Sequence, residues 1–210
     1  MIFTHDGDEH ATEADRVVNG AGRVANMDEL DLASGWVEHD HGRVAVDDYL
    51  RSVSNLRVYV CGDALATSPQ LSPLANYEGD IVGRNIVESA KHRPDYEGMA
   101  TAVYNSRACR CGTTEAAARQ KGLAVGVHVN NMLGRFSAKT YAEAVAWSKI
   151  IVDRATDRLV GAHFVGHDGQ ELINVFGLAI KFGNTARQLK DHVYAYPTFS
   201  ADIRHMFAHA

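Results

Sequence analysis

The stretch Val58–Asp63, of sequence VYVCGD, leads through a polar loop into Leu71–Ala75, of sequence LSPLA. A β-prone run closed by a Gly-Asp pair predicts a buried strand that ends in an acid. Ser72 and Pro73 supply an N-cap hydroxyl and a proline at the first helical position, so they predict the start of a long helix. Strand, loop and helix in this order indicate an α/β unit, with Asp63 at the carboxyl edge of its sheet.

The helix that begins at Ser72 is expected to end within Lys91–Pro94. Gly79 and Gly83 lie four residues apart on it, which would let another backbone come close. Its apolar face is expected to carry Leu74, Tyr77, Ile81, Val82, Asn85 and Ile86.

The residues before this region carry weaker signals. Asp15–Val18 predicts a short strand that ends in a turn at Asn19–Gly22, and Arg43–Val46 alternates like a half-buried strand. Residues 20–25 have the glycine spacing of a dinucleotide-binding fingerprint, but no amphipathic helix of a βαβ unit follows. An independent nucleotide-binding protein is therefore only an alternative.

Beyond Pro94 the pattern changes to runs of strands with helices near the end, which predicts a separate α+β unit and a boundary near residue 97. Leu172–Phe182 is apolar on nearly all sides, so it is either a core helix or a helix at a subunit interface, and Gly183 ends it. The other expected elements are a helix over Ala116–Lys121 capped by Thr113–Glu115, a strand over Leu123–Val129, a hairpin of Tyr141–Val152 with Leu159–Val165, and a short helix from Thr185.

Composition excludes several classes of function. The 210 residues hold 26 acidic and 21 basic side chains, a formal charge of -5, with Lys and Arg scattered. This charge pattern predicts no binding to nucleic acid or to a membrane surface, and the longest uncharged apolar stretch, Leu172–Ile180, is too short to span a bilayer. An acidic start unlike a signal peptide, and three cysteines without a C-x-x-C, predict a reduced, cytoplasmic protein. The histidines show no metal-ligand spacing, so no metal is expected.

Five segments, in order, resemble the FAD-dependent pyridine nucleotide-disulfide oxidoreductases, the family of glutathione reductase, dihydrolipoamide dehydrogenase and mercuric reductase. The resemblance implies a fold class of α/β and α+β: the tail of an FAD-binding domain, then an interface domain of antiparallel sheet with flanking helices. The matching segments are Asn19–Asn26, similar to A-T-G-R-x-P-N; Val58–Asp63, similar to the second FAD motif; Leu71–Ala75, similar to the segment that runs past the flavin; Cys111–Ala116, similar to V-G-L-T-E-A; and Lys149–Asp153 with Leu159–His163, similar to the central hairpin of the dimerisation domain.

The resemblance implies that residues 1–96 are the end of an NAD(P) domain and the C-terminal part of an FAD-binding domain, and that residues 97–210 are a dimerisation domain. It implies FAD as the cofactor, NAD(P)H as the co-substrate and a homodimer as the assembly. By the same resemblance Asp63 would hold the ribityl hydroxyls of FAD. The other implied cofactor contacts are Gly62, Leu71, Ser72 and Pro73.

The family's Gly-rich FAD fingerprint and its C-x4-C redox pair have no counterpart in this sequence. We therefore expect the chain to be the C-terminal part of such an enzyme, as an expressed piece or a truncated gene product, and to hold no FAD tightly by itself. The alternative is a non-catalytic homodimerisation module with no cofactor of its own.

The segment Tyr196–Ala201, of sequence YPTFSA, departs from the family's H-P-T-x-S-E. Tyr196 takes the position of the acid-base histidine, and an alanine takes that of its glutamate. A phenol with an ordinary pKa of about 10 is a poor acid-base group at neutral pH. Tyr196 is therefore interpreted as a residue packed at a subunit contact or as a hydrogen-bond donor near the flavin, and Asp202 is a candidate for the missing acid.

Residues 104–111 also depart from the family, which has an apolar strand at this place. Arg107 and Arg110 are expected to weaken this strand. Cys111 stands where the family has valine, so it is interpreted as a core residue.

Overall fold

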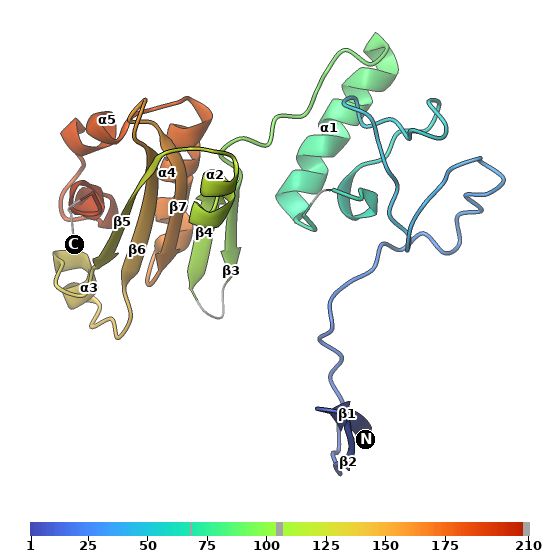
Figure 1. Cartoon of the computed structure of the whole chain (residues 1–210), viewed down its shortest axis with the longest axis horizontal. Helices are drawn as coiled ribbons and strands as arrows, with labels where there is room; N and C mark the ends of the chain where they lie inside the picture. Colours follow the sequence, from blue (N-terminus) through green and yellow to red (C-terminus); the bar gives the residue numbers. More distant parts are fainter. Residues whose placement is uncertain (68, 104–106, 208–210) are drawn as a thin grey trace. The chain divides into compact units, whose positions relative to one another are not determined.

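The computed structural model describes residues 1–67, 69–103 and 107–207 and divides into two compact units, Met1–Pro94 (unit 1) and Asp95–Ala210 (unit 2) (Figure 1). Parts of the predicted loop before Gln70 and of the predicted strand at residues 104–111 lie outside the described residues. Unit 1 consists largely of turns around one long helix, whereas unit 2 is a five-stranded antiparallel sheet with helices. This mixture of helix and antiparallel sheet confirms the predicted fold class.

The long helix of unit 1 is α1, Ser72–Glu88 (Figure 1). Its predicted existence is confirmed, but Leu71 is the N-cap and makes no side-chain cap, so Ser72 is helical and does not cap the helix. The helix tolerates Pro73 because backbone N–H groups of the first turn have no partner within a helix. The side chains that α1 buries are Leu74, Glu78, Ile81 and Asn85.

α1 covers a small apolar core. The apolar face predicted for this helix is wrong in part. Tyr77 and Ile86 are exposed. A Cβ added at Gly79 or Gly83 would meet no atom of the described chain within 4 Å, so no backbone of these residues comes close there. The core of unit 1 consists of Val37, Val44, Leu50, Val60, Leu65 and Ile81.

The predicted strands of unit 1 are wrong. Val58–Cys61 makes one isolated bridge, and the chain continues into a 3-10 turn, η1, Gly62–Ala64. Arg43–Val46 likewise makes only isolated bridges, and Asp15–Val18 is exposed without regular structure. β propensity reflects the packing of a strand against neighbouring strands, and single bridges do not provide it.

A hairpin at the start of the chain was not expected from the sequence. Strands β1, Ile2–His5, and β2, Asp8–Ala11, pair in antiparallel fashion. Asp6 and Gly7 between them both have positive φ, as a tight two-residue hairpin turn requires. Every residue of both strands is exposed. Neither strand therefore has the buried side that produces an alternating sequence pattern, which is the signal used to predict strands.

Unit 2 is built on a sheet with the strand order β3-β4-β7-β6-β5. The predicted hairpin of β6 and β7 is confirmed, although β6 starts at Trp147 rather than Tyr141 because the end of a short helix and its turn take up the preceding residues. The strands are β3, Ala100–Val103; β4, Ala108–Gly112; β5, Val125–Asn131; β6, Trp147–Asp153; and β7, Leu159–Val165. The weakened strand expected around Arg110 is β4, which pairs with β7 along its whole length and with β3 from Ala108 to Cys111.

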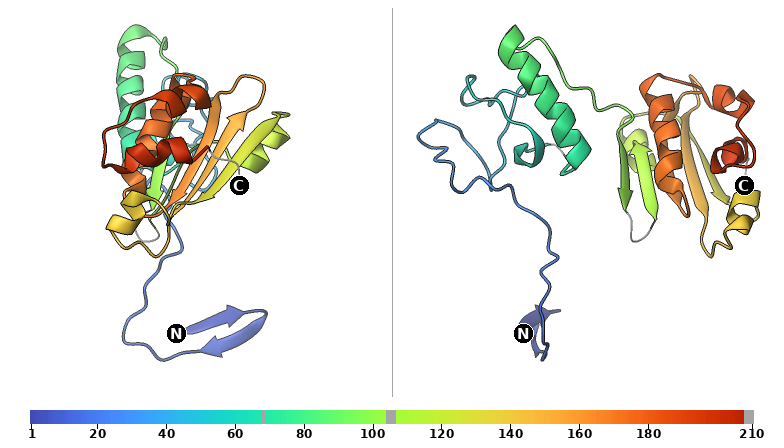
Figure 2. Two further views of the ribbon diagram at one scale, coloured as in Figure 1. Left: turned by 90° about the vertical axis from the view of Figure 1, so that its left-hand side faces the viewer. Right: turned by 180° about the vertical axis from the view of Figure 1, so that it is seen from behind.

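Helices cover both faces of this sheet: Figures 1 and 2 show α4 on one face and α2 on the other. The predicted cap of α2 is confirmed, because Thr114 Oγ1 accepts from Ala117 N at 3.2 Å. The short helix predicted from Thr185 is also present, and Thr185 forms a capping box with Gln188 at its start. The helical elements of unit 2 are α2, Glu115–Gln120; α3, Phe136–Thr140; α4, Gly169–Lys181; α5, Ala186–Asp191; and a 3-10 segment, η2, Phe199–His205.

α4 carries the centre of the core of unit 2. Ile173 and Phe176 are fully buried in one apolar cluster with residues of the sheet and η2. Burial of each such side chain stabilises the fold by roughly 1.5–3 kcal/mol. The predicted apolar helix is confirmed, but it is not buried on all sides: Leu178 is 60% exposed, and Phe182, at its C-cap, is 74% exposed.

Two glycines let the chain that enters unit 2 cross α4 closely. Gly98 has a φ of +74°, and a Cβ on it would lie 2.2 Å from the carbonyl oxygen of Gly177. A Cβ on Gly177 would lie 2.6 Å from the carbonyl oxygen of Gly98. Since real Cβ atoms do not approach other atoms so closely, only glycine fits at both positions. An ion pair from Lys181 Nζ to Asp95 Oδ2, 2.5 Å long, holds the same crossing.

β5 forms one edge of the sheet, and β3 forms the other. The backbone N–H of Arg154 donates to the carbonyl oxygen of Ala124 at 2.8 Å and so continues the β5–β6 ladder by one residue. The side chain of Arg154 shields the start of the β5 edge, because its Nε donates to the carbonyl oxygen of Val125 at 3.1 Å. Among the described residues, no helix has both the length and the apolar character needed to cross a bilayer.

Candidate functional site

The five predicted cofactor-binding residues lie in two neighbouring segments of unit 1. Gly62 and Asp63 belong to η1, whereas Leu71, Ser72 and Pro73 form the N-cap and first residues of α1. The two segments are packed together, because a Cβ on Gly62 would lie 3.1 Å from the Cβ of Ala75. The expected sheet edge does not exist, since Val58–Cys61 forms no strand, and the turn is positioned by the helix instead.

The position of this turn depends on Glu78, which was not expected from the sequence. The backbone N–H of Gly62 donates to Glu78 Oε2 at 2.7 Å, and Glu78 is 0% exposed. Its place four residues after Leu74, on the buried face of α1, is the signal that could have indicated it. A carboxylate on the buried face of a helix needs a hydrogen-bond donor, and the backbone N–H of Gly62 in the turn is that donor.

Asp63 offers acceptor oxygens beside a helix N-terminus. Its side chain is half-buried, and its carboxylate has no hydrogen bond or ion pair with the described residues. The first turn of a helix leaves backbone N–H groups available to a ligand, and no side chain caps α1. A carboxylate beside helix N–H groups can bind a hydroxyl-rich ligand, because each hydroxyl both donates and accepts.

Cys61 precedes this turn and is exposed at the surface. Partial desolvation of its thiol and the negative charge of Glu78 raise the pKa of Cys61. A raised pKa lowers the thiolate fraction, so this cysteine is not an activated nucleophile.

Tyr196 lies in unit 2 and is 71% exposed. Its ring centroid is 5.4 Å from that of Phe136, and a cis peptide bond joins it to Pro197. Tyr196 also lines a cavity of about 480 Å³ that includes residues of α5 and η2. The ionisable side chains of its wall, besides two tyrosines, are Lys190, Asp191, His192, Asp202, Arg204 and His205.

Asp202, the candidate for the missing acid, does not pair with Tyr196. Asp202 Oδ2 accepts a hydrogen bond from Ser137 Oγ on α3. The hydroxyl of Tyr196 has no hydrogen-bond partner among the described residues. An acid-base pair of the kind suggested for these two residues is therefore not formed.

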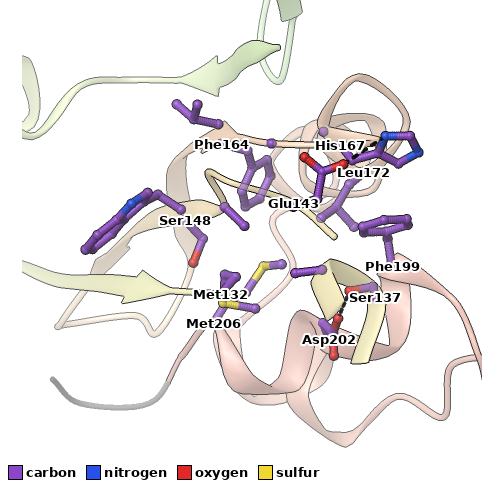
Figure 3. Close-up of a pocket in the computed structure, with 16 residues that line it drawn as sticks. Met132, Ser137, Glu143, Ser148, Phe164, His167, Leu172, Phe199, Asp202 and Met206 are labelled. Atoms are coloured by element: carbon purple, nitrogen blue, oxygen red, sulfur yellow. Dashed lines mark hydrogen bonds and ion pairs between the residues drawn. The ribbon is translucent and has the colours of Figure 1, made fainter. Parts of the chain in front are cut away.

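A smaller pocket of about 40 Å³ is lined by residues of the sheet, α3, α4 and η2 (Figure 3). Ser148 Oγ in its wall is buried and has no hydrogen-bond partner within the described part of the chain. A cavity of this size has room for one or two water molecules and not for a nucleotide. Its apolar wall includes Met132, Phe164, Leu172, Phe199 and Met206.

A charge cluster closes one side of this pocket (Figure 3). Glu143, whose side chain is 10% exposed, accepts from Arg107 Nη1 at 3.1 and 3.2 Å and lies 3.2 Å from His167 Nδ1. The ring of His167 stacks on Tyr141, with 4.4 Å between the centroids. Both carboxylate oxygens of Glu143 thus have a partner, and the cluster joins three loops.

The remaining cysteines lie in the core. Cys109 and Cys111 are unpaired and buried on the same side of β4, which confirms the interpretation of Cys111 as a core residue. Burial raises the pKa of Cys109 to about 11 and that of Cys111 to about 12. Among the described residues, no three His, Cys, Asp or Glu side chains are placed to hold a metal ion.

Unit 1 thus presents the turn η1 packed against the start of α1, and unit 2 is an α+β domain with exposed apolar side chains on α4. The profile described as "Pyridine nucleotide-disulphide oxidoreductase, dimerisation domain" matches residues 99–207, and that described as "Pyridine nucleotide-disulphide oxidoreductase" matches residues 2–79. The chain belongs to the pyridine nucleotide-disulphide oxidoreductase family, whose members use FAD and NAD(P)H.

Relatives of two lengths match this chain. It is 35% identical over 179 residues to a 19.7 kDa protein of the mercuric resistance operon of Staphylococcus aureus, covering 84% of this chain and 99% of that one. It is 32% identical over 200 residues to a mercuric reductase of Staphylococcus aureus, covering 94% of this chain and 36% of the reductase. The chain thus spans about a third of that enzyme.

A solved structure shows the same fold. The HOCl-induced flavoprotein disulfide reductase RclA from Escherichia coli matches with a TM-score of 0.80 at 21% identity, covering 97% of this chain and 48% of RclA. At this level of identity the match concerns the fold alone.

Proposed function

We propose that this chain supplies part of the flavin site and the homodimer interface of an FAD-dependent, NAD(P)H-linked oxidoreductase. The observation that carries the proposal is the turn η1, which holds the unpaired carboxylate of Asp63 beside the start of α1. Residues 1–96 are assigned to the end of the NAD(P) domain and the C-terminal part of the FAD-binding domain, and residues 97–210 to the dimerisation domain.

The residues present fit the polyol part of FAD. Asp63 would accept hydrogen bonds from the ribityl hydroxyls, and Gly62 with the segment Leu71, Ser72 and Pro73 would lie along the same part of the cofactor. The tight clearance between Gly62 and Ala75 keeps the turn next to the start of the helix. When bound, FAD would supply the electron-transfer chemistry.

The described residues do not fit the pyrophosphate of FAD. A pyrophosphate site needs a Gly-rich turn that opens a helix of a βαβ unit. Residues 20–25, which have the glycine spacing of that turn, lie in a segment without helix or strand. We therefore expect the chain alone to bind FAD weakly.

The homodimer is proposed to form through α4. Leu178 and Phe182 lie one turn apart and are both largely exposed, next to a face that is fully buried. Two apolar side chains at this spacing form a stripe that a second helix can cover. Tyr196 is proposed as a contact residue of the assembled enzyme and not as its acid-base catalyst, because it has no orienting carboxylate.

The test uses the purified 210-residue chain. We expect no stoichiometric flavin absorbance after purification, and we expect added FAD to shift the amide NMR signals of Gly62 and Asp63 with weak affinity. Asp63→Asn should weaken these shifts, whereas Asp80→Asn, an exposed acid on α1, should not. Sedimentation should show a dimer. A yellow protein with one flavin per chain would contradict the expectation of weak binding, and a monomer at high concentration would contradict the interface.

The second candidate is a non-catalytic homodimerisation module. It is favoured by the 19.7 kDa relative, which matches over 99% of its own length, so proteins of about this extent occur in the family. A dimer whose Gly62 and Asp63 signals do not respond to millimolar FAD would support the module and contradict a flavin site.

A further inference from the structure

α1 buries a charged side chain, Glu78, on the same face as Leu74 and Ile81. Glu78 is 0% exposed, and the nearest buried residues along that face are Leu74 and Ile81. Taking a carboxylate out of water carries a large penalty unless donors replace the lost water. The N–H of Gly62 is such a donor, at 2.7 Å from Glu78 Oε2, so the position of the carboxylate and that of the turn depend on each other.

The turn is held to α1 at two points. The first is the hydrogen bond to Glu78, and the second is the packing of Gly62 against Ala75, where an added Cβ would lie 3.1 Å from the Cβ of Ala75. The φ of +69° at Gly62 is one that other residues rarely adopt. The turn itself is closed by the backbone N–H of Leu65, which donates to the carbonyl oxygen of Gly62 at 3.0 Å. Asp63 thus belongs to a short, rigid turn whose anchor is Glu78.

We propose that Glu78 is the positioning residue of this site: it fixes Gly62 and thereby sets where Asp63 presents its carboxylate to a neutral polyol. For the identity of the ligand this inference rests on the proposed function, whereas the anchoring rests on the contacts of Glu78 alone. A hydrogen bond from an N–H to a carboxylate is stronger than one to a neutral oxygen, which suits an anchor.

The same carboxylate also selects the class of ligand. Glu78 places negative charge next to the turn that carries Asp63. Two carboxylates attract hydroxyl donors and repel phosphate, although an uncapped helix N-terminus by itself favours anions. The site is therefore expected to take the uncharged, hydroxyl-bearing part of a flavin and to reject inorganic phosphate.

The test compares three variants of the full chain. Glu78→Gln keeps an acceptor oxygen but removes the charge, Glu78→Leu removes both, and Asp80→Asn removes an exposed acid of the same helix. Hydrogen exchange at the Gly62 amide should be unchanged in Asp80→Asn, close to wild type in Glu78→Gln, and about 10- to 100-fold faster in Glu78→Leu. Equal protection in Glu78→Leu and wild type would overturn the anchoring.

The alkylation rate of Cys61 against pH provides a second readout that needs no ligand and no Leu variant. Because the charge of Glu78 helps to raise the pKa of Cys61, Glu78→Gln should move the alkylation profile to lower pH. Asp80→Asn should leave the profile in place. A profile that does not move in Glu78→Gln would contradict a charged carboxylate at the turn.

Riboflavin and inorganic phosphate are the ligand probes. Riboflavin should shift the Asp63 amide signal in wild type and Glu78→Gln and have much less effect in Glu78→Leu, whereas phosphate should shift it in none of these. An equal response to riboflavin in Glu78→Leu would overturn the positioning role. If riboflavin shifts nothing while the exchange and alkylation results hold, the anchoring stands and the proposed flavin site fails.

Discussion

Ser137 Oγ donates a hydrogen bond to Asp202 Oδ2 and so ties α3 to η2 in unit 2. Ser137 is buried and Asp202 is half-buried, so the pair is partly shielded from water. The bond occupies the carboxylate that the sequence suggests as a replacement acid beside Tyr196. The C-terminal segment is therefore held by a structural contact.

Removing this contact should destabilise unit 2. Ser137→Ala leaves a half-buried carboxylate without its donor, so we expect the free energy of unfolding to fall by about 1–3 kcal/mol. Urea denaturation followed by circular dichroism measures this change. Asp191→Asn, at an exposed acid nearby, is the control and should lie within about 0.5 kcal/mol of wild type. An unchanged Ser137→Ala midpoint would show that the bond contributes nothing.

The capping box of α5 should be measurable in the same way. Thr185 Oγ1 accepts from Gln188 N at 3.1 Å, and Gln188 Oε1 accepts from Thr185 N at 2.9 Å. Thr185→Ala should lower the free energy of unfolding by about 1 kcal/mol, and Thr185→Ser should restore most of it. A serine variant as unstable as the alanine variant would argue that the lost methyl group, and not the cap, is responsible.

The three thiols should react at different rates. Cys61 is exposed, whereas Cys109 and Cys111 are buried with pKa values raised to about 11 and about 12. At pH 8 a thiol reagent should modify one cysteine in the folded protein, and all three in denaturant. Cys61→Ser should abolish the reaction in the folded state. Two or three reactive thiols without denaturant would contradict the burial of Cys109 and Cys111.

Acid should destabilise unit 2 partly through Glu115. Hydrogen bonds from Lys149 Nζ, at 2.8 Å, and Arg119 Nε, at 3.0 Å, hold the pKa of Glu115 below its ordinary value. The unfolded chain then binds the proton more readily, so this contribution is complete above the ordinary pKa of glutamic acid and is lost as the pH falls through the lowered value.

Glu115→Gln should therefore flatten the dependence of the unfolding free energy on pH in this acidic window. Thermal melts between neutral pH and the acid transition measure the slope. Glu171→Gln is the matched control, because its exposed carboxylate makes no ion pair with the described residues. Equal slopes in wild type and Glu115→Gln would show that the two cations do not stabilise the folded carboxylate.

The proposed interface on α4 should respond to charge. Leu178→Glu and Phe182→Glu place a carboxylate on the exposed apolar stripe, so each should weaken the dimer by at least about tenfold in dissociation constant. Leu56→Glu, at a loop residue of unit 1 that is 57% exposed, should not change it. Sedimentation velocity over a concentration series measures the constant. Unchanged dimers in both α4 variants would place the interface elsewhere.

Elements with a local signal could be predicted from the sequence. Thr114 and Thr185 indicate the starts of the helices that follow them. The β6–β7 hairpin is indicated by two apolar runs on either side of a polar turn. Val58–Cys61 shows the limit of such signals. Its composition favours a strand, but a strand also needs a neighbour along its length, and unit 1 provides a single bridge.

The contacts that build the candidate site could not be predicted because they join residues far apart in the chain. Glu78 and Gly62 are 16 residues apart, and Ser137 and Asp202 are 65 apart. The residues next to an acid or a serine in a helix do not indicate which distant residue forms a hydrogen bond with it. The motif around Asp63 could indicate the class of ligand, but only the folded chain shows that a buried glutamate holds the turn.

The hydrogen bond from Arg154 Nε to the edge strand β5 bears on solubility. A seven-residue edge with free carbonyl and N–H groups is a template onto which a strand of another molecule can add, the first step of cross-β aggregation. Arg154 Nε occupies the carbonyl oxygen of Val125 and puts a charge where an incoming strand would begin to pair. A single arginine in the turn after β6 thus places a charged group at one end of this edge, a feature that disfavours the addition of a strand from another molecule.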